Sequence, residues 1–180
     1  MILPYQEVKR LVNEKGLVSN YSSLDEQLQP AGFDLRLGKV YEVAHFSRQG
    51  AGALKADGSK VLPKLRLLAE KPGEAVYFQR GTAYLFESME SVKVPRDLTA
   101  RIQPRLSTCL IGLSLQTADI DAGYEGGLRF SAHCINQCSV DVGTRFAQVI
   151  FQQLSAPTEK PYEGTYQKTK GLEFAPKPSE

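Results

Sequence analysis

The sequence predicts an all-β protein, a sandwich or a distorted barrel, with one short helix at its N-terminus. Three observations support this prediction. Many short apolar or alternating runs follow one another at close spacing, glycine and proline residues separate them, and helical periodicity is confined to the start of the chain. A chain of 180 residues, 42% of them hydrophobic, is long enough for one domain with a sizeable core.

Helical periodicity is clear only over Pro4–Lys15. Val8, Leu11 and Val12 recur at the spacing of one helix face. A proline stands at the start of this segment and Gly16 follows it, a favourable first residue and a frequent stop. We therefore expect a short helix there and little helix after it.

The residues after this helix predict the first long strand. A polar approach, Ser22–Pro30, leads into Ala31–Leu37, where apolar and polar residues alternate as in a half-buried strand. Gly38 is expected to turn the chain into a second run, Val40–Val43. Asp34 then lies in the first strand, among backbone hydrogen-bond donors.

The middle of the chain predicts a loop and then a series of strands. The glycine-containing segment Phe46–Lys60 is expected to be a mobile excursion or a hairpin tip, and it is where we expect disorder. Pro72-Gly73 and Arg80-Gly81 predict turns. The strands expected along the rest of the chain are Leu65–Leu68, Glu74–Gln79, Thr82–Glu87, Leu98–Gln103, Gly112–Gln116 and Arg145–Leu154.

The run Ala118–Asn136 holds most of the functional information. A carboxylate, Asp121, and an aromatic ring, Tyr124, stand on a glycine-rich segment, which predicts a tight turn over Ile120–Gly126 at the tip of a hairpin. The same residues suit a purely structural turn, in which Asp121 accepts a local hydrogen bond and Tyr124 packs on the turn. On the residues alone both interpretations stay open.

The strand after this turn has two different faces. Because side chains alternate along a strand, one face is expected in the core and the other is available for function. The core face comprises Leu128, Phe130, Ala132 and Cys134. The other face comprises Arg129, Ser131 and His133.

Charge and hydropathy narrow the class of protein. The net charge of +2 and the interspersed acids argue against a nucleic-acid-binding surface. No apolar run approaches the ~18 residues of a membrane span, and the N-terminus lacks a signal-peptide pattern. We therefore expect a cytoplasmic protein that binds neither nucleic acid nor membrane.

The cysteines are Cys109, Cys134 and Cys138, an odd number that argues against a disulfide framework and suits a reducing compartment. His133 beside Cys134 suggests a zinc site with Cys138, but the spacing supplies no fourth ligand. We expect core or surface thiols instead.

Five segments, in order, resemble the motifs of the trimeric dUTPase and dCTP deaminase superfamily. The resemblance covers roughly residues 1 to 174, and five ordered motifs are far more specific than one. The segments are Ala31-Gly-Phe-Asp-Leu35, a divergent second motif Pro104-Arg-Leu-Ser107, Asp121-x-Gly-Tyr124-x-Gly126 ending at Asn136, Gly143-Thr-Arg-Phe-Ala-Gln148, and Pro161-Tyr-Glu-Gly-Thr-Tyr-Gln167, which is similar to the tail of the deaminase-like branch.

The resemblance implies a distorted jelly-roll-like β-barrel of the dUTPase type, assembled as a homotrimer with sites at subunit interfaces. It implies deoxyuridine or deoxycytidine triphosphate as the substrate. It further implies that residues 1–155 form the barrel domain and residues 156–180 an arm that closes over a neighbouring subunit's site. A frayed terminus is the structural alternative for the last ten residues.

The resemblance also assigns roles to residues. Asp121 would hold and deprotonate a water for in-line attack at the α-phosphorus, with diphosphate leaving. Tyr124 would stack on the sugar and exclude a 2′-hydroxyl, with a core tyrosine as the alternative. Arg105, Ser107 and Gln148 would donate hydrogen bonds to phosphate oxygens, with salt bridges between subunits or a buried polar network as their structural alternative.

In the arm, Tyr166, Gln167 and Lys170 are expected to bind substrate. Lys168 is a further phosphate partner by this interpretation, unless the two lysines form only a solvated basic patch. No protein ligands for a metal are expected, because Mg²⁺ commonly keeps its waters and takes oxygens from substrate phosphates. Asp34 either supports the site or ties the first motif into the fold.

Particular positions decide between the two activities of the superfamily. The zinc-independent deaminases use a glutamate after the turn, with a serine and an arginine after the second motif, and these positions hold Ser131, Leu106 and Leu110. The signature of the zinc-dependent deaminases is absent too. We therefore predict a dUTP diphosphatase. The alternatives are a zinc-independent dCTP deaminase and a non-catalytic, nucleotide-binding regulatory trimer.

The chain departs from the dUTPase pattern in two places. Leu106 stands where dUTPases have a serine that touches phosphate, so Ser107 would have to substitute through a shift of one residue. The tail also lacks the glycine-rich closing loop of ordinary dUTPases. The nucleobase is expected to be recognised by backbone atoms of residues 120–130. The sequence therefore does not indicate whether uracil or cytosine is preferred.

Overall fold

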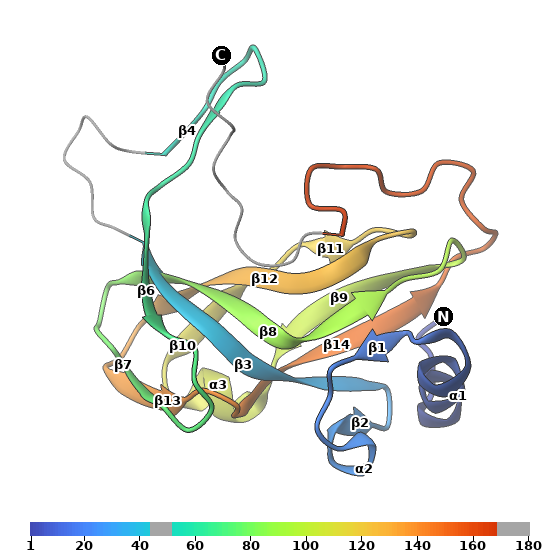
Figure 1. Cartoon of the computed structure of the whole chain (residues 1–180), viewed down its shortest axis with the longest axis horizontal. Helices are drawn as coiled ribbons and strands as arrows, with labels where there is room; N and C mark the ends of the chain where they lie inside the picture. Colours follow the sequence, from blue (N-terminus) through green and yellow to red (C-terminus); the bar gives the residue numbers. More distant parts are fainter. Residues whose placement is uncertain (44–51, 169–180) are drawn as a thin grey trace.

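The computed structural model describes residues 1–43 and 52–168, shown in Figure 1. The helices in these ranges are α1 (Tyr5–Lys15), α2 (Leu24–Gln27) and α3 (Leu106–Leu110). The strands are β1 (Val18–Ser19), β2 (Leu28–Gln29), β3 (Gly32–Val43), β4 (Ala53–Leu54), β5 (Lys60–Val61), β6 (Leu65–Ala69), β7 (Ala75–Phe78), β8 (Ala83–Lys93), β9 (Leu98–Pro104), β10 (Leu113–Gln116), β11 (Asp119–Ile120), β12 (Glu125–Cys134), β13 (Cys138–Asp141) and β14 (Arg145–Gln153).

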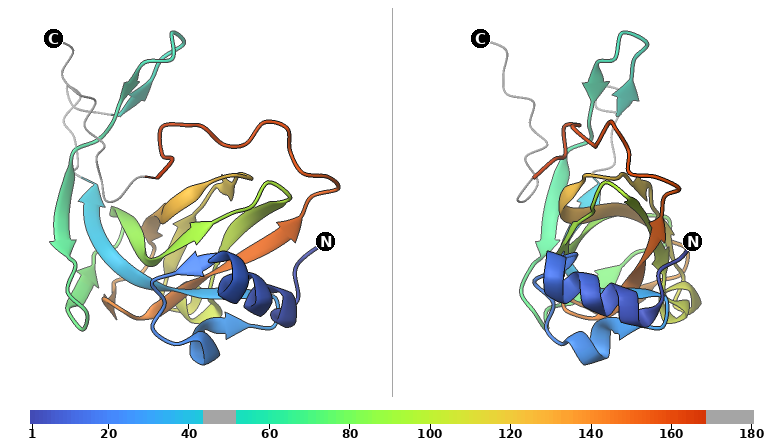
Figure 2. Two further views of the ribbon diagram at one scale, coloured as in Figure 1. Left: turned by 45° about the vertical axis from the view of Figure 1, so that its right-hand side comes forward. Right: turned by 90° about the vertical axis from the view of Figure 1, so that its right-hand side faces the viewer.

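Most strands belong to one antiparallel sheet that curls around a common interior, as the end-on view in Figure 2 shows. Its main path runs β10-β12-β8-β3-β14-β9-β11, while β7 and β13 form a separate pair. The first half of β3 pairs with β14 and its second half with β8 and β6, so this one long strand joins the two sides of the curl. The expected all-β, dUTPase-like fold with a short N-terminal helix is confirmed.

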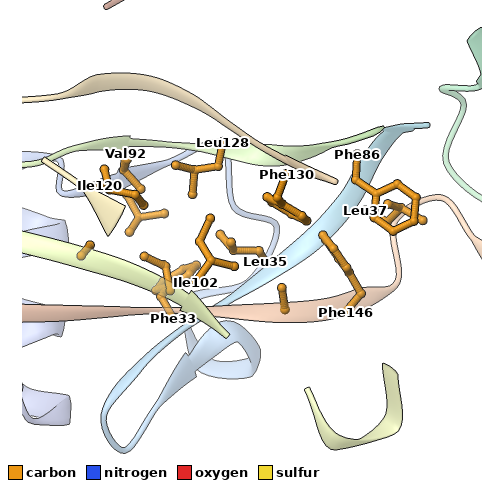
Figure 3. Close-up of a cluster of buried hydrophobic side chains, with 14 of the residues drawn as sticks. Phe33, Leu35, Leu37, Phe86, Val92, Ile102, Ile120, Leu128, Phe130 and Phe146 are labelled. Atoms are coloured by element: carbon orange, nitrogen blue, oxygen red, sulfur yellow. The ribbon is translucent and has the colours of Figure 1, made fainter. Parts of the chain in front are cut away.

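The core fills the inside of this curl. Figure 3 shows apolar side chains of β3, β8, β9, β11, β12 and β14 meeting there. Phe130 and Phe146 stack with ring centroids 5.2 Å apart, and Phe86 meets Phe146 edge-on at 5.8 Å. The predicted core face of β12 is confirmed, because the four side chains expected inside are all buried.

Helix α1 packs against β2 and β3 at the side of the curl. Its buried residues are Val8, Leu11 and Val12, the face that the sequence predicts. Gly16 adopts φ 65° and donates its N–H to the carbonyls of the last turn, as a left-handed helix stop does. None of the helices within the described ranges combines the length and apolarity needed to cross a bilayer.

The expected turn at Gly38 is wrong, because Gly38 lies inside the continuous strand β3. A Cβ at this position would lie 2.9 Å from the backbone oxygen of Glu87. The pairing of β3 with β8 shifts register between Leu37 and Val40, which indicates a bulge. The glycine therefore serves the close approach of two strands, not a change of direction.

The expected hairpin around Asp121 is also wrong, although its turn is present. Strand β11 before the turn pairs with β9, whereas β12 after it pairs with β8. The turn thus connects two sides of the curled sheet. The sequence also did not predict β13, the extension of β8 to Lys93, or the short helices α2 and α3.

The glycine-containing excursion is described only from residue 52 onward. There, β4 and β5 pair as a two-stranded hairpin that projects from the body of the protein, which agrees with a hairpin tip (Figure 2). The part of the disorder prediction that falls on residues 46–51 lies outside the described residues. The division into a barrel, residues 1–155, and an arm, residues 156–180, stays a prediction.

Candidate functional site

The turn that carries Asp121 is fixed by backbone hydrogen bonds. The N–H of Tyr124 donates to the carbonyl of Asp121 at 3.1 Å, and Gly123 supplies the left-handed conformation with φ 89°. Val94 clamps the turn from the next segment, because its carbonyl accepts from Gly123 at 3.0 Å and its N–H donates to Tyr124 at 2.8 Å. These hydrogen bonds therefore fix the backbone conformation at Asp121 and Tyr124.

Tyr124 is held at its ring and at its hydroxyl. The hydroxyl donates to the carbonyl of Gly127 at 2.6 Å. The ring meets Tyr162 edge-on, with centroids 5.5 Å apart, and also packs against the core. The half-buried ring is thus both a packing element and a wall of the adjacent cavity.

A cavity of about 290 Å³ lies beside the turn. Its walls are mainly apolar, and a carboxylate and aromatic rings stand among them, which is typical of a small-molecule site. Its lining comprises Leu85, Ile102, Ala118, Asp119, Ile120, Asp121, Tyr124, Gly127, Leu128, Arg129, Tyr162 and Tyr166.

Asp121 differs from the neighbouring acid Asp119. The Asp119 carboxylate pairs with Arg101 at 2.9 Å. The exposed carboxylate of Asp121 makes no hydrogen bond or ion pair with any residue of the described ranges. It is therefore available at the cavity to accept a proton from a bound water.

The arm after β14 returns over this turn, as Figure 1 shows. The N–H of Tyr162 donates to the carbonyl of Ala122 at 2.8 Å, and Tyr166 lines the cavity. Gln167 bonds the backbone of Gly123 at 2.8 Å. Two of the predicted arm residues thus lie beside Asp121 and Tyr124, while Lys170 lies outside the described residues.

A second group of predicted residues gathers around Asp34. The Arg105 Nε and the Arg145 Nη1 lie 3.4 Å and 3.6 Å from Asp34 Oδ2, and the Gln148 Nε2 lies 3.4 Å from Asp34 Oδ1. Asp34 is 1% exposed, and its Oδ2 accepts no hydrogen bond from any residue that the structure describes. Burial raises the pKa of this carboxyl, although both guanidinium groups oppose the change.

Arg145 joins this group because β14 is irregular. In a regular strand Arg145 and Gln148 point to opposite faces. The register of β14 against β3 shifts between Arg145 and Ala147, and both side chains reach Asp34. The guanidinium of Arg145 also donates to the carbonyl of Glu26.

The two groups lie apart in one chain. Strand β11 runs antiparallel to β9 with Asp119 opposite Arg101, so Asp121 lies about level with a position two residues before Arg101, whereas Arg105 follows four residues after it. These roughly six positions separate Asp121 and Arg105 by about 20 Å along the strand direction. Ser107 is on the exposed surface of α3, beyond the end of β9. A single chain therefore does not bring the predicted phosphate-binding residues close to Asp121, the predicted catalytic base.

The positions that separate a deaminase from a diphosphatase lie within the described residues. The hydroxyl of Ser131 donates to the side-chain oxygen of Gln116 at 3.1 Å. The nearest buried acid on the neighbouring strand, Glu87, accepts from Arg129 at 2.7 Å. Leu110 is 75% exposed on α3, so this leucine is not part of the core.

The structure gives no support to a zinc site in the described residues. Cys134 is buried, whereas His133 is exposed on the opposite face of β12. No three His, Cys, Asp or Glu side chains gather within the described ranges. Burial beside Cys134 raises the pKa of the Cys138 thiol to about 11, which keeps it protonated.

Sequence analysis did not identify two residues of these groups. Tyr162 belongs to the segment Pro161–Gln167 in the arm, but nothing in the sequence indicates that it contacts Tyr124. The sequence assigns no role to Arg145, because the face on which its side chain lies depends on whether the strand is regular. Both depend on contacts between segments far apart in the chain.

Comparisons with known proteins agree on one family. A family model described as dCTP deaminase-like matches residues 2–154. A probable deoxyuridine 5′-triphosphate nucleotidohydrolase of Archaeoglobus fulgidus is 33% identical over 168 residues, covering 92% of this chain and 95% of the relative. A dUMP-forming dCTP deaminase of Dictyoglomus turgidum is 28% identical over 167 residues, covering 90% and 85%.

Among solved structures, a 2′-deoxycytidine 5′-triphosphate deaminase from Agrobacterium tumefaciens matches with a TM-score of 0.64 at 27% identity. The match covers 84% of this chain but 47% of that chain, so this protein spans about half the length of that deaminase. The superfamily indicated by the five motifs is confirmed.

Proposed function

The chain belongs to the dCTP deaminase-like family, and we propose that within it the protein is a dUTP diphosphatase that converts dUTP to dUMP and diphosphate. The family processes deoxynucleoside triphosphates, and its named members include both deaminases and a probable dUTP nucleotidohydrolase. The choice between these activities therefore depends on the residues of this chain.

The observation that carries the proposal is the distribution of carboxylates around the cavity. Asp121 lines the cavity with a carboxylate that has no partner among residues 1–43 and 52–168, which suits a base for phosphate hydrolysis. Position 131, where the zinc-independent deaminases carry a glutamate, presents a hydroxyl bonded to Gln116. Glu87, the nearest buried acid on the next strand, accepts a hydrogen bond from Arg129 at 2.7 Å and does not replace that glutamate.

The proposed reaction follows from these groups. Asp121 accepts a proton from a water, whose oxygen forms a bond to the α-phosphorus. The bond from that phosphorus to the bridging oxygen breaks in line, and diphosphate leaves with the electron pair. Tyr124 stacks on the deoxyribose, where its fixed ring leaves no room for a 2′-hydroxyl.

We also propose a homotrimer in which one copy completes the site of another. Arg105 stands about 20 Å from Asp121 along the strand direction in one chain. Gln148 belongs with Arg105 to the group around Asp34, so one triphosphate does not use this group and Asp121 of the same chain together. Ser107 on the exposed α3 fits the same scheme. Assembly would bring the phosphate-binding group of one copy to the turn of its neighbour.

Mg²⁺ fits this arrangement as an ion that arrives with the triphosphate. The described residues gather no cluster of three ligating side chains, and Mg²⁺ keeps several waters while binding phosphate oxygens. When bound, the ion would neutralise part of the phosphate charge. Orientation of the water and recognition of the sugar remain tasks of Asp121 and Tyr124.

A deaminase remains the second candidate, because several relatives are named dCTP deaminases. The discriminating experiment incubates the purified protein with dUTP and, separately, with dCTP in the presence of Mg²⁺, and identifies the products. We expect dUMP and diphosphate from dUTP and no uracil-containing product from dCTP. Deamination of dCTP would overturn the assignment, and tight binding without turnover would favour the regulatory alternative.

The variant Asp121→Asn directly tests the role of Asp121 as the catalytic base. It preserves shape but cannot accept the proton, so we expect turnover to fall by about 100-fold or more while the melting temperature stays near that of the parent protein. Asp119→Asn, two residues earlier on β11, is the matched control, because its parent carboxylate is paired with Arg101. Equal activity of Asp121→Asn and the parent protein would remove Asp121 from the mechanism.

A further inference from the structure

The arm after β14 is attached to the catalytic turn of its own chain through one side chain, Gln167. The amide oxygen of Gln167 accepts from the N–H of Glu125 at 2.9 Å. Its amide nitrogen donates to the carbonyl of Gly123 at 2.8 Å and to the carbonyl of Tyr162 at 3.2 Å. The single half-buried amide therefore joins both ends of the turn to the arm.

Backbone hydrogen bonds on either side of Gln167 extend this attachment. The N–H of Tyr162 donates to the carbonyl of Ala122, and the N–H of Lys168 donates to the carbonyl of Glu125, both at 2.8 Å. These bonds satisfy backbone groups of the turn that would otherwise face solvent. The arm and the turn thus form one hydrogen-bonded unit.

The sequence of the turn leaves space for the arm. A Cβ on Gly123 would lie 2.6 Å from the Cβ of Pro161 and 3.1 Å from the backbone nitrogen of Tyr162. The absence of a side chain at this position therefore permits direct contact between the two segments. The ring of Tyr162 then reaches Tyr124 and forms part of the cavity wall.

We infer that Gln167 is a positioning residue, which fastens the arm to the turn of the same chain and so holds Asp121 and Tyr124 in place. The amide satisfies both of its polar atoms on backbone groups, so it is occupied before any substrate arrives. This differs from the expected direct contact of Gln167 with substrate. Only the kinetic consequence of the inference rests on the proposed function.

The substitution Gln167→Glu tests the inference with almost no change in shape. A carboxylate can still accept from Glu125, but it cannot donate, and it places an oxygen against the carbonyls of Gly123 and Tyr162. The matched control is Glu163→Gln at an exposed position of the same arm. This change is also isosteric, but it removes a negative charge, whereas Gln167→Glu adds one.

The first measurement is amide hydrogen exchange of the full chain without nucleotide. Exchange at Tyr162, Lys168 and Glu125 should accelerate about 10- to 100-fold in Gln167→Glu, because loss of two hydrogen bonds opens the unit. Exchange of the β14 amides and of the β12 amides after Glu125 should stay as in the parent protein, and Glu163→Gln should match the parent protein throughout. Unchanged exchange of the arm in Gln167→Glu would overturn the inference.

The second measurement is steady-state hydrolysis of dUTP. A displaced turn should lower kcat as well as kcat/KM, by about tenfold, because Asp121 loses its orientation. A rise in KM at constant kcat, with exchange unaltered, would mean that Gln167 touches substrate, and it would refute the positioning role. If the parent protein does not hydrolyse dUTP, the exchange result still decides the inference, while the proposed function fails separately.

Discussion

Replacement of Asp34 by asparagine is expected to stabilise the protein and weaken its function. Asp34 is almost fully buried, and within the described part of the chain its Oδ2 has no hydrogen bond. The guanidinium groups of Arg105 and Arg145 approach this oxygen only to 3.4 Å and 3.6 Å, and both are partly exposed. The carboxylate thus loses much of its hydration without gaining close partners.

The magnitude follows from two opposing contributions. The side chains of Arg105 and Arg145 are 34% and 35% exposed, so solvent screens the attraction of each guanidinium for the carboxylate to about 1 kcal/mol or less. Desolvation of the buried carboxylate costs several kcal/mol. Since burial is the larger cause and raises the pKa of Asp34, we expect Asp34→Asn to raise the free energy of unfolding at neutral pH by about 1 kcal/mol.

The sign of the pH dependence is fixed by the raised pKa. Below the unfolded value of 3.8, Asp34 is neutral in both states, and the parent protein and variant should be equally stable. As the pH rises through 3.8 toward the higher pKa of the folded state, the unfolded state ionises first, and the parent protein loses stability relative to the variant. The difference should then stay constant up to neutral pH.

Urea unfolding at pH values between 4 and 7.5 checks this expectation. Glu70→Gln is the control, because its pair with Lys39 is exposed at 3.3 Å and should contribute below about 1 kcal/mol. Steady-state hydrolysis of dUTP by Asp34→Asn should show a raised KM, since Arg105 loses the charge that orients it. A loss of about 3–5 kcal/mol at neutral pH, the usual result of breaking a buried ion pair, would refute the reasoning.

Three further substitutions test other parts of the structure. Gly38→Ala should lower the free energy of unfolding by about 1–3 kcal/mol in thermal or urea unfolding, because its methyl group meets the backbone oxygen of Glu87 at 2.9 Å; no change would show that the strands can separate without cost. Glu90→Gln should cost about 3–5 kcal/mol, because it removes the buried charge that pairs with Arg36 at 2.7 Å and turns one of the two oxygens that accept from Arg36 and Gln27 into a donor, and a loss below about 1 kcal/mol would contradict this. Tyr124→Phe should cost about 1 kcal/mol through loss of the hydroxyl bond to a backbone carbonyl, and it should lower discrimination between dUTP and UTP in competition assays, whereas unchanged discrimination would separate the hydroxyl from sugar recognition.

Local patterns were enough to predict several elements. The apolar spacing and the glycine stop predicted α1, and the alternation after Asp121 predicted which side chains of β12 enter the core. The turn at Asp121 followed from its glycines, because left-handed backbone conformations depend on the residue itself. These predictions needed no information on distant segments.

The remaining features depend on partners that sequence periodicity does not contain. Gly38 was expected to turn the chain, but its small size serves the approach of β8. The face of Arg145 changed through one extra residue in β14, which a strict period of two does not represent. Likewise, no pattern in the arm indicated that the Gln167 amide bonds the turn of its own chain.

The distance between Asp121 and Arg105 has a consequence for mixed assemblies. If neighbouring copies complete one another, a chain defective at Asp121 and a chain defective at Arg105 would each lack a different half of the machinery. Unfolded together and allowed to reassemble, two inactive preparations would recover part of their turnover, because some sites would combine the intact halves. Genetic complementation between two null alleles of one gene would be the cellular counterpart of the same geometry.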